Sequence, residues 1–341
     1  MVFDQRKVDL FDDKMKLVFF QELAKWSAQE CCDLAVLNKQ LLVSNQRAKK
    51  RLYEVRVQSP DDYRNSPLIR GMIEKIPRLP LFVHTLTSRL MDENATVSQI
   101  ADIIQRDPSL TADVLRKVNS PYYGLGSKIS DISSAVLFMG FETLYQVAIS
   151  EGLRRSMPET AEFEDIHAQA LATSQMLFSM SRTTGISIPV RMATIGLLHN
   201  LGQSVGELFI KKNPDYEMMV NLIDQSQLGA LLLVEWELPE AICRAVQYQD
   251  YPEFAPPAAI PEDVVDNVTL LYFAKLCYKL LCGTSESKLS SVYTEEYKSR
   301  FGWDGLPINE ILKKYVMVDL MKKINTLPEF IRQLFYNFRD S

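Results

Sequence analysis

Glycine is scarce in this chain of 341 residues: it occurs 13 times, about 4% against a usual share of roughly 7%. The first glycine is Gly71. Tight turns between strands need glycine at positions of positive φ, so a turn-rich all-β fold is disfavoured. The chain also lacks alternating apolar runs bounded by hairpin turn residues. These two absences predict a helical protein.

Long apolar runs, a signal-peptide core and paired cysteines are lacking as well. No stretch of about 18 apolar residues occurs, and the N-terminus alternates apolar and charged residues. The five cysteines are an odd number without CxxC spacing, which is typical of reduced thiols. A formal charge of −5 gives no general attraction to phosphate backbones or anionic lipid. We expect a cytoplasmic protein that binds neither nucleic acid nor membranes.

The N-terminal part contains no helix breakers. Residues 1–59 hold neither proline nor glycine, and apolar residues recur there at helical spacing, which predicts one long helix or a helical hairpin. Turn residues follow between 59 and 70. We therefore predict an N-terminal helical segment over 1–70, which is the best candidate for homo-oligomer contacts or for receiving a partner helix. The remainder is divided into a bundle over 71–262 and a helical C-terminal extension over 263–341.

Helix start and stop signals are dense after residue 95. Thr96 and Gln99 have the spacing of a capping box, and Asp107-Pro108 opens a second helix with a cap and a proline at its first position. Gly140 ends a later helix. Further helices are predicted at 189–201, 224–237, 239–249, 263–282 and 306–323, and the proline-rich stretch 251–261 is predicted to be a linker or surface loop.

His199 is the most informative of only three histidines. At helical spacing it shares a face with Met192, Ile195 and Gly202, so its ring points inward. An inward histidine is usually a hydrogen-bonded core residue. The alternative is a metal ligand, because a His followed directly by Asp in a buried helix binds a divalent metal in one family of phosphohydrolases. Here Asn200 follows, and an amide oxygen is a neutral, weak ligand.

Four stretches, in order, resemble the HDOD domain, a signalling branch related to the HD superfamily of metal-dependent phosphohydrolases. They are Ile76-Pro-Arg-Leu-Pro80, Ile103-Ile-Gln-Arg-Asp-Pro-Ser-Leu-Thr-Ala112, Val118-Asn-Ser-Pro-Tyr-Tyr-Gly124 and Ile132-Ser-Ser-Ala-Val-Leu-Phe-Met-Gly140. The likeness runs from about 72 to 255, and it implies an all-α, HD-like multi-helix bundle. The residues that match the family motifs are Pro77, Pro80, Asp107, Pro108, Asn119, Ser120, Tyr122, Tyr123, Gly124 and Gly140.

The resemblance also identifies the positions of a metal site that has degenerated. His167 matches the family histidine that precedes the HD doublet, and His199 matches the histidine of the doublet. The remaining positions, where relatives carry Asp or His, hold Asn200, Gln225, Gln249 and Asp250. Glutamine is a poor ligand for a hydrolytic divalent centre. We therefore expect no metal, no cofactor and no catalytic residue, and a closed polar cluster around His167, His199 and Asn200.

The resemblance implies a non-catalytic regulatory module that acts through a protein partner in a bacterial signalling pathway. Two alternatives stay open. The former pocket could serve a small-ligand, for example nucleotide, sensor. A degenerate HD-type phosphohydrolase would instead hold a metal at His167 and His199.

Overall fold

The computed structural model describes most of the chain beyond residue 65. The described residues are 66–74, 76, 83, 85–86, 89, 96–120, 128–140, 144, 147–152, 161–214, 217–220, 223–327 and 329–339. The predictions for the N-terminal segment up to residue 65, and for Pro77, Pro80, Tyr122, Tyr123 and Gly124, lie outside these ranges. Within them every regular element is helical, so the predicted all-α class is confirmed.

The first group of helices has the predicted caps. It comprises α6 (Pro67–Ile73), α8 (Val97–Gln105), α9 (Pro108–Val118) and α10 (Ile132–Met139). The capping box of α8 is formed, because the backbone N–H of Thr96 donates to Gln99 Oε1 at 3.0 Å while that of Gln99 donates to Thr96 Oγ1 at 3.4 Å. Asp107 caps α9 by accepting from the backbone of Leu110 at 2.8 Å. Gly140 follows α10 with φ of 77°, a left-handed conformation that ends the helix.

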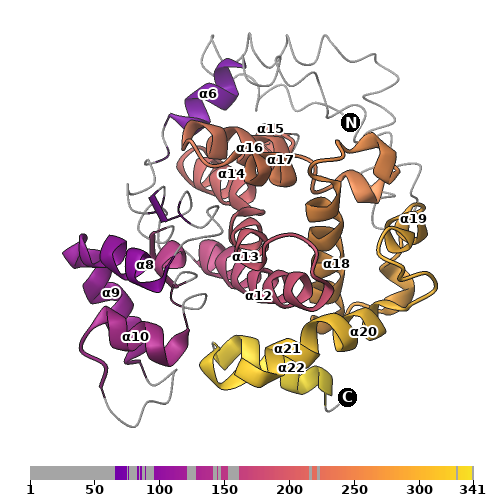
Figure 1. The fold of residues 1–341 in the computed structure, drawn as a ribbon. Coiled ribbons are helices and arrows are strands. Elements are labelled where there is room, and N and C mark those ends of the chain that lie inside the picture. The colour runs from indigo at the N-terminus through magenta and orange to yellow at the C-terminus, as the bar shows by residue number, and fades with distance from the viewer. Residues whose placement is uncertain are drawn as a thin grey trace.

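The central helices begin with a long, largely buried helix, α12, which contacts α13 and α14. They are α12 (Ala161–Thr184), α13 (Pro189–Leu198), α14 (Leu201–Lys212), α15 (Glu217–Val220), α16 (Gln225–Glu235) and α17 (Glu240–Gln247). In Figure 1, α8, α9 and α10 lie together to one side of α12 and α13. The backbones of α12 and α13 approach closely because Gly196 has no side chain: a Cβ there would lie 2.6 Å from Ser174 Cα. This contact fixes the position of the residues that follow α13.

The C-terminal helices pack against the same core. They are α18 (Val265–Leu281), α19 (Thr294–Ser299), α20 (Ile308–Ile311), the π-helical turn η6 (Leu312–Met317), α21 (Val318–Leu320), the 3₁₀ turn η7 (Met321–Thr326) and α22 (Glu329–Arg339). One hydrophobic cluster runs from Ile69 to Phe335, and α18 contacts α12, α13 and α17. Figure 1 shows α18 crossing the bundle beside α12. The domain boundaries at 70 and 262 stay predictions.

Two sequence predictions differ from the structure. The helix predicted over 306–323 is interrupted by η6 and η7, whose hydrogen-bond spacing differs from that of an α-helix. The stretch predicted as a linker, 251–261, forms the 3₁₀ turns η3 (Tyr251–Glu253) and η4 (Pro257–Ala259), and its residues Pro252 and Phe254 are buried. Ser291 donates to the Pro252 carbonyl at 2.7 Å. This stretch is therefore part of the packed structure.

Candidate functional site

His199 lies just after α13 and is buried, as its spacing predicted, with 4% of its surface exposed. Its Nδ1 donates to the Gly196 carbonyl at 2.8 Å, and Nε2 has no hydrogen-bond partner among the described residues. Burial, followed by the charge of Lys275, lowers the pKa of His199 from 6.5 to about 4, although the Gly196 bond and Asp250 oppose this shift. At neutral pH the ring is uncharged.

A lysine ammonium occupies the polar network next to His199. Lys275, on α18, donates to Asp250 Oδ1 at 2.6 Å and to Gln249 Oε1 at 3.2 Å. Gln249 Nε2 in turn donates to the His199 carbonyl at 2.6 Å. Ser226, in the first turn of α16, donates to Asp250 Oδ2 at 2.6 Å. The network thus joins α13, α16, α17 and α18 through one cation and one carboxylate.

Asp250 is ionised within this network. Partial burial opposes the charge on its carboxyl group, but the Lys275 ammonium and the hydroxyl of Ser226 outweigh that penalty and lower its pKa below the ordinary value. The pair is half-buried, since the Lys275 side chain is 19% exposed and that of Asp250 41%. The negative charge of Asp250 is therefore already balanced from within the protein.

His167 and Asn200 lie at a different, smaller space. His167 Nε2 is 3.0 Å from Ser150 Oγ, and its ring stacks on Phe163 with centroids 5.7 Å apart. Asn200 Nδ2 donates to the Ile166 carbonyl at 2.7 Å. Both residues line a cavity of about 10 Å³, which is roughly the room of one water molecule.

Gln225 belongs to a helix contact. Its Nε2 is 3.4 Å from the Val220 carbonyl. Its backbone oxygen packs against Gly202 so closely that a Cβ on Gly202 would lie only 1.8 Å from it. The six predicted positions are therefore arranged as three groups: His199 with Gln249 and Asp250, His167 with Asn200, and Gln225 between α14 and α16.

The donor set does not fit a divalent metal. Among the residues that the structure describes, no three His, Cys, Asp or Glu side chains come together as a metal site needs. Asn200 and Gln249 offer neutral amides, and Asn200 donates its amide N–H to a carbonyl. The ammonium of Lys275 would also repel a second cation close to Asp250 and His199.

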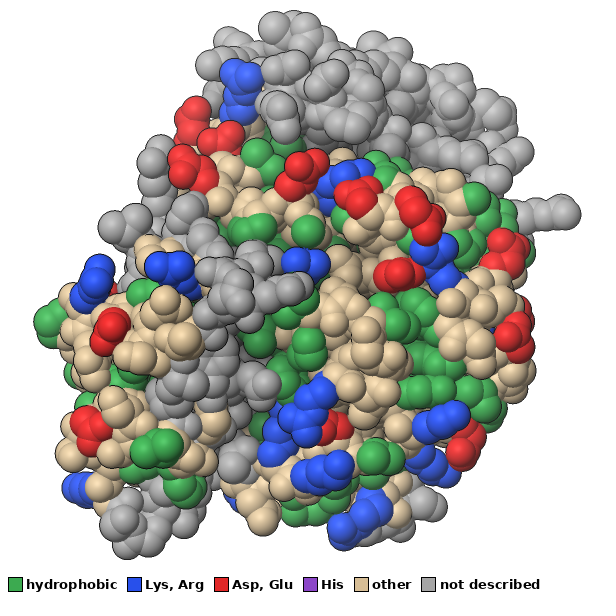
Figure 2. Space-filling model, in the orientation of Figure 1, with side chains coloured by type: hydrophobic (Ala, Val, Ile, Leu, Met, Phe, Trp, Pro, Cys, Tyr) green, Lys and Arg blue, Asp and Glu red, His purple; other side chains and the backbone are tan. Residues whose placement is uncertain are grey.

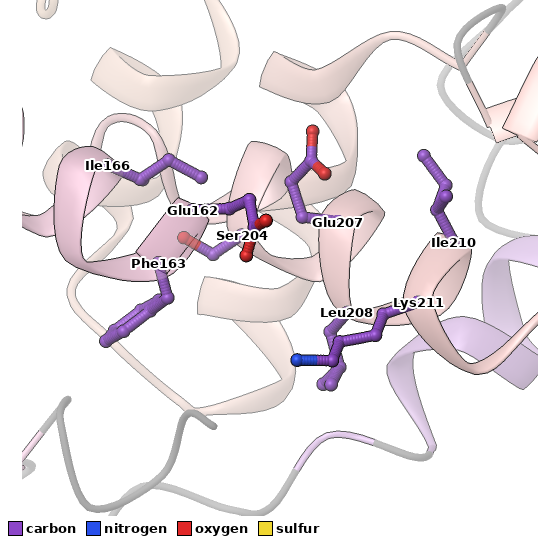
Figure 3. Close-up of a pocket in the computed structure, with 8 residues that line it drawn as sticks. All are labelled: Glu162, Phe163, Ile166, Ser204, Glu207, Leu208, Ile210 and Lys211. Atoms are coloured by element: carbon purple, nitrogen blue, oxygen red, sulfur yellow. The ribbon is translucent and has the colours of Figure 1, made fainter. Parts of the chain in front are cut away.

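A larger cavity of about 270 Å³ adjoins the small one and lies between α12 and α14. Phe163, Ile166 and Ser204 line both spaces. Figure 3 shows its lining residues from the two helices, which are Glu162, Phe163, Ile166, Ser204, Glu207, Leu208, Ile210 and Lys211. Two carboxylates and one ammonium give the lining a net negative charge, which disfavours phosphate groups.

Sequence reasoning did not find Lys275 or the larger cavity. A signal for Lys275 was present, because a lysine in the apolar run 268–277 is unusual unless its ammonium is paired. The cavity had no such signal. Glu162 and Glu207 lie 45 positions apart in sequence, and only the packing of α12 on α14 brings them together.

Comparisons with known proteins agree on the fold. The HDOD domain family model matches residues 76–252, more than half of the chain. An uncharacterised protein of Treponema pallidum (strain Nichols) is 26% identical over 232 residues, covering 63% of this chain and 44% of the relative. The chain matches less than half the length of each curated relative.

Two crystal structures extend the likeness over most of the chain. A protein from Marinobacter aquaeolei VT8, provisionally assigned to signal transduction, is 18% identical with a TM-score of 0.60 over 83% of this chain and 67% of that one. A provisionally assigned phosphohydrolase from Shewanella amazonensis SB2B is 20% identical with a TM-score of 0.55, over 79% of this chain and 99% of that one. At these identities the likeness establishes the fold. No helix in the described ranges is long and apolar enough to cross a membrane.

Proposed function

The chain belongs to the HDOD domain family, and from this we propose that it is a non-catalytic regulatory module that binds a protein partner in a bacterial, cytoplasmic signalling pathway. The family and the signal-transduction assignment of the Marinobacter structure support a signalling role. The mode of action, the absence of catalysis and the compartment are our proposal.

One observation carries the non-catalytic part of the proposal: the ammonium of Lys275 holds the Asp250 carboxylate and the Gln249 amide. A hydrolytic divalent metal needs several anionic or imidazole ligands whose lone pairs are free to point at it. Here the only carboxylate of the network is neutralised by a lysine, and the neighbouring histidine ring is buried. These side chains stabilise the junction of four helices and leave little coordinating capacity.

Metal analysis tests this directly against the phosphohydrolase alternative. Protein is purified without chelator, incubated with Mn²⁺, Fe²⁺, Mg²⁺ or Zn²⁺, desalted and measured by elemental analysis. We expect no stoichiometric metal and no phosphodiester hydrolysis. Bound metal together with hydrolysis, both lost in His199→Ala and retained in the matched exposed variant Lys212→Ala, would establish the enzyme instead.

The nucleotide-sensor alternative receives less support from the two cavities at the former metal positions and beside them. The space at His167 and Asn200 has room for about one water, and the adjoining 270 Å³ cavity is lined by Glu162 and Glu207. A thermal-shift panel of mono-, di- and cyclic nucleotides tests it. A ligand at 100 times its Kd adds about 2.7 kcal/mol to stability, so a flat panel counts against a sensor.

Partner capture tests the interaction itself. Affinity-tagged full-length protein is crosslinked in extracts of the native host, and specific partners are identified against an unrelated helical protein as bait. We expect at least one enriched partner. The N-terminal segment is tested by light scattering of the full chain and of a deletion of 1–59. Unchanged partners and oligomeric state in the deletion would refute the role predicted for that segment, and an empty capture would refute the interaction module.

A further inference from the structure

The C-terminal part of the chain, outside the family match, carries a lysine-rich surface. Between residues 305 and 328 the sequence has four lysines and two acidic residues, in a chain whose formal charge is −5. This region is the irregular succession of α20, η6, α21 and η7. In Figure 2, Lys and Arg side chains gather over the lower part of the molecule, where α21 lies in Figure 1.

Burial removes one of the two carboxylates from this surface. Asp319 is 3% exposed, and its Oδ1 pairs with Arg182 of α12 at 2.5 Å, so its charge is directed into the protein. The other carboxylate, Glu310, pairs with Lys313 at 3.1 Å. The surface therefore presents three exposed lysines, Lys313, Lys314 and Lys322, and one exposed carboxylate, Glu310, which is already paired with Lys313.

The outward lysines differ in what they contact. Lys314 lies over the Tyr315 ring at 5.1 Å, and Lys323 lies over the Phe178 ring at 4.1 Å. Lys314 and Lys322 are exposed, and neither has a carboxylate partner among the residues that the structure describes. Their charges are available to a partner.

An exposed apolar side chain lies between these two lysines in the sequence. Val318 is 56% exposed, four positions after Lys314 and four before Lys322. Single exposed apolar residues are common on protein surfaces, and one that lies among lysines can serve an interface as a small anchor within a charged rim.

We infer that this surface, the lysine face (Lys313, Lys314, Val318, Lys322 and Lys323), docks an acidic amphipathic helix of another protein. The inference rests on the proposed function and names the surface and the chemistry of its partner. Opposite charge steers the encounter and selects the partner, while Val318 contacts an apolar residue between the partner's carboxylates.

Site-specific photo-crosslinking in the full-length protein tests this inference. A photo-reactive amino acid replaces Val318 or, as a second site far from the lysine face, the 88% exposed Leu137 of α10. Crosslinking in native-host cells is compared for the wild-type background, for Lys314→Glu/Lys322→Glu, and for the matched charge reversal Arg106→Glu/Lys212→Glu at exposed positions elsewhere. Mass spectrometry identifies the crosslinked peptide and its net charge.

The expected result is a crosslink from position 318 to an acidic segment of another protein. Its yield should fall at least tenfold in Lys314→Glu/Lys322→Glu and stay unchanged in the matched reversal. A neutral or basic target, a second copy of this chain, nucleic acid or lipid, or a yield insensitive to the lysine reversal overturns the inference. Crosslinks from position 137 alone, or from neither position, overturn the lysine face but leave the proposed function standing, because partner capture tests that function separately.

Discussion

Replacing Gly202 with alanine should separate α14 from α16. A Cβ at this position would lie 1.8 Å from the backbone oxygen of Gln225 and 2.8 Å from the backbone N of Gly229. Both are main-chain atoms, so no side-chain rotation can relieve the contact. Because nonbonded heavy atoms rest about 3.5 Å apart, the two backbones must move apart by more than about 1 Å.

The cost follows from what this movement disturbs. Overpacking a close-packed core usually costs about 1–3 kcal/mol, and we expect the upper end here because two helix backbones must shift together. The first turn of α16 carries Ser226, whose hydroxyl binds Asp250, so the polar network next to His199 should loosen as well. Alanine's better helix propensity returns less than about 1 kcal/mol.

Urea unfolding followed by tryptophan fluorescence measures the effect, since Trp236 lies buried at the end of α16. Gly202→Ala should lower the midpoint with little change in slope. The matched control is Gly71→Ala in α6, where a Cβ meets nothing within 4 Å, and it should stabilise by about 0.4–1 kcal/mol. Equal midpoints for Gly202→Ala and wild type would refute the reasoning.

Three further predictions concern buried charges. The pKa of His199 is about 4 in the folded protein and 6.5 when the residue is exposed, so between these pH values the unfolded chain binds a proton that the folded chain does not. About 3 kcal/mol of stability present above pH 6.5 should therefore be lost as the pH falls to 4. Urea midpoints measured across this range should show the loss, and the loss should be smaller in His199→Gln. Lys275→Met should raise the pKa of His199, measured by NMR titration, and an unshifted pKa would contradict the role of the lysine charge. The same variant should lower the free energy of unfolding by about 1–2 kcal/mol, a modest loss because Asp250 is partly exposed. Asp319→Asn should lower the free energy of unfolding, measured by thermal denaturation, by about 1 kcal/mol because it weakens the contact with Arg182. The control is Glu310→Gln, which removes the charge of an exposed ion pair with Lys313, and an equal effect of the two variants would show that burial of the acid is irrelevant.

The sequence determined the helices with local chemical signals. Thr96, Gln99 and Asp107 formed the caps that their spacing predicted, and Gly140 ended α10 at positive φ. These features depend on hydrogen bonds within a few residues, so the chain order alone specifies them. The helical class followed from such signals and from the composition, and the family followed from the resemblance of four stretches to the HDOD domain.

Tertiary contacts decided what the sequence could not. The helix predicted over 306–323 is present as a succession of α, π and 3₁₀ turns, and a tertiary contact lies within it, where Thr183 of α12 donates to the Tyr315 carbonyl at 2.7 Å. The predicted polar cluster is divided into groups, with His167 and Asn200 at a small cavity and His199 beside Gln249 and Asp250. Lys275 reaches Asp250 only because α18 packs against the bundle.

Glycine illustrates the division between the two levels. Its scarcity in the composition is enough to indicate a helical protein. Why Gly196 and Gly202 occur on either side of His199 depends on neighbours distant in sequence, Ser174 and Gln225, whose backbones occupy the space of a side chain. Composition limits the secondary structure because propensity is local, whereas the arrangement of the site depends on which helix surfaces meet, and that is fixed only when the whole core packs.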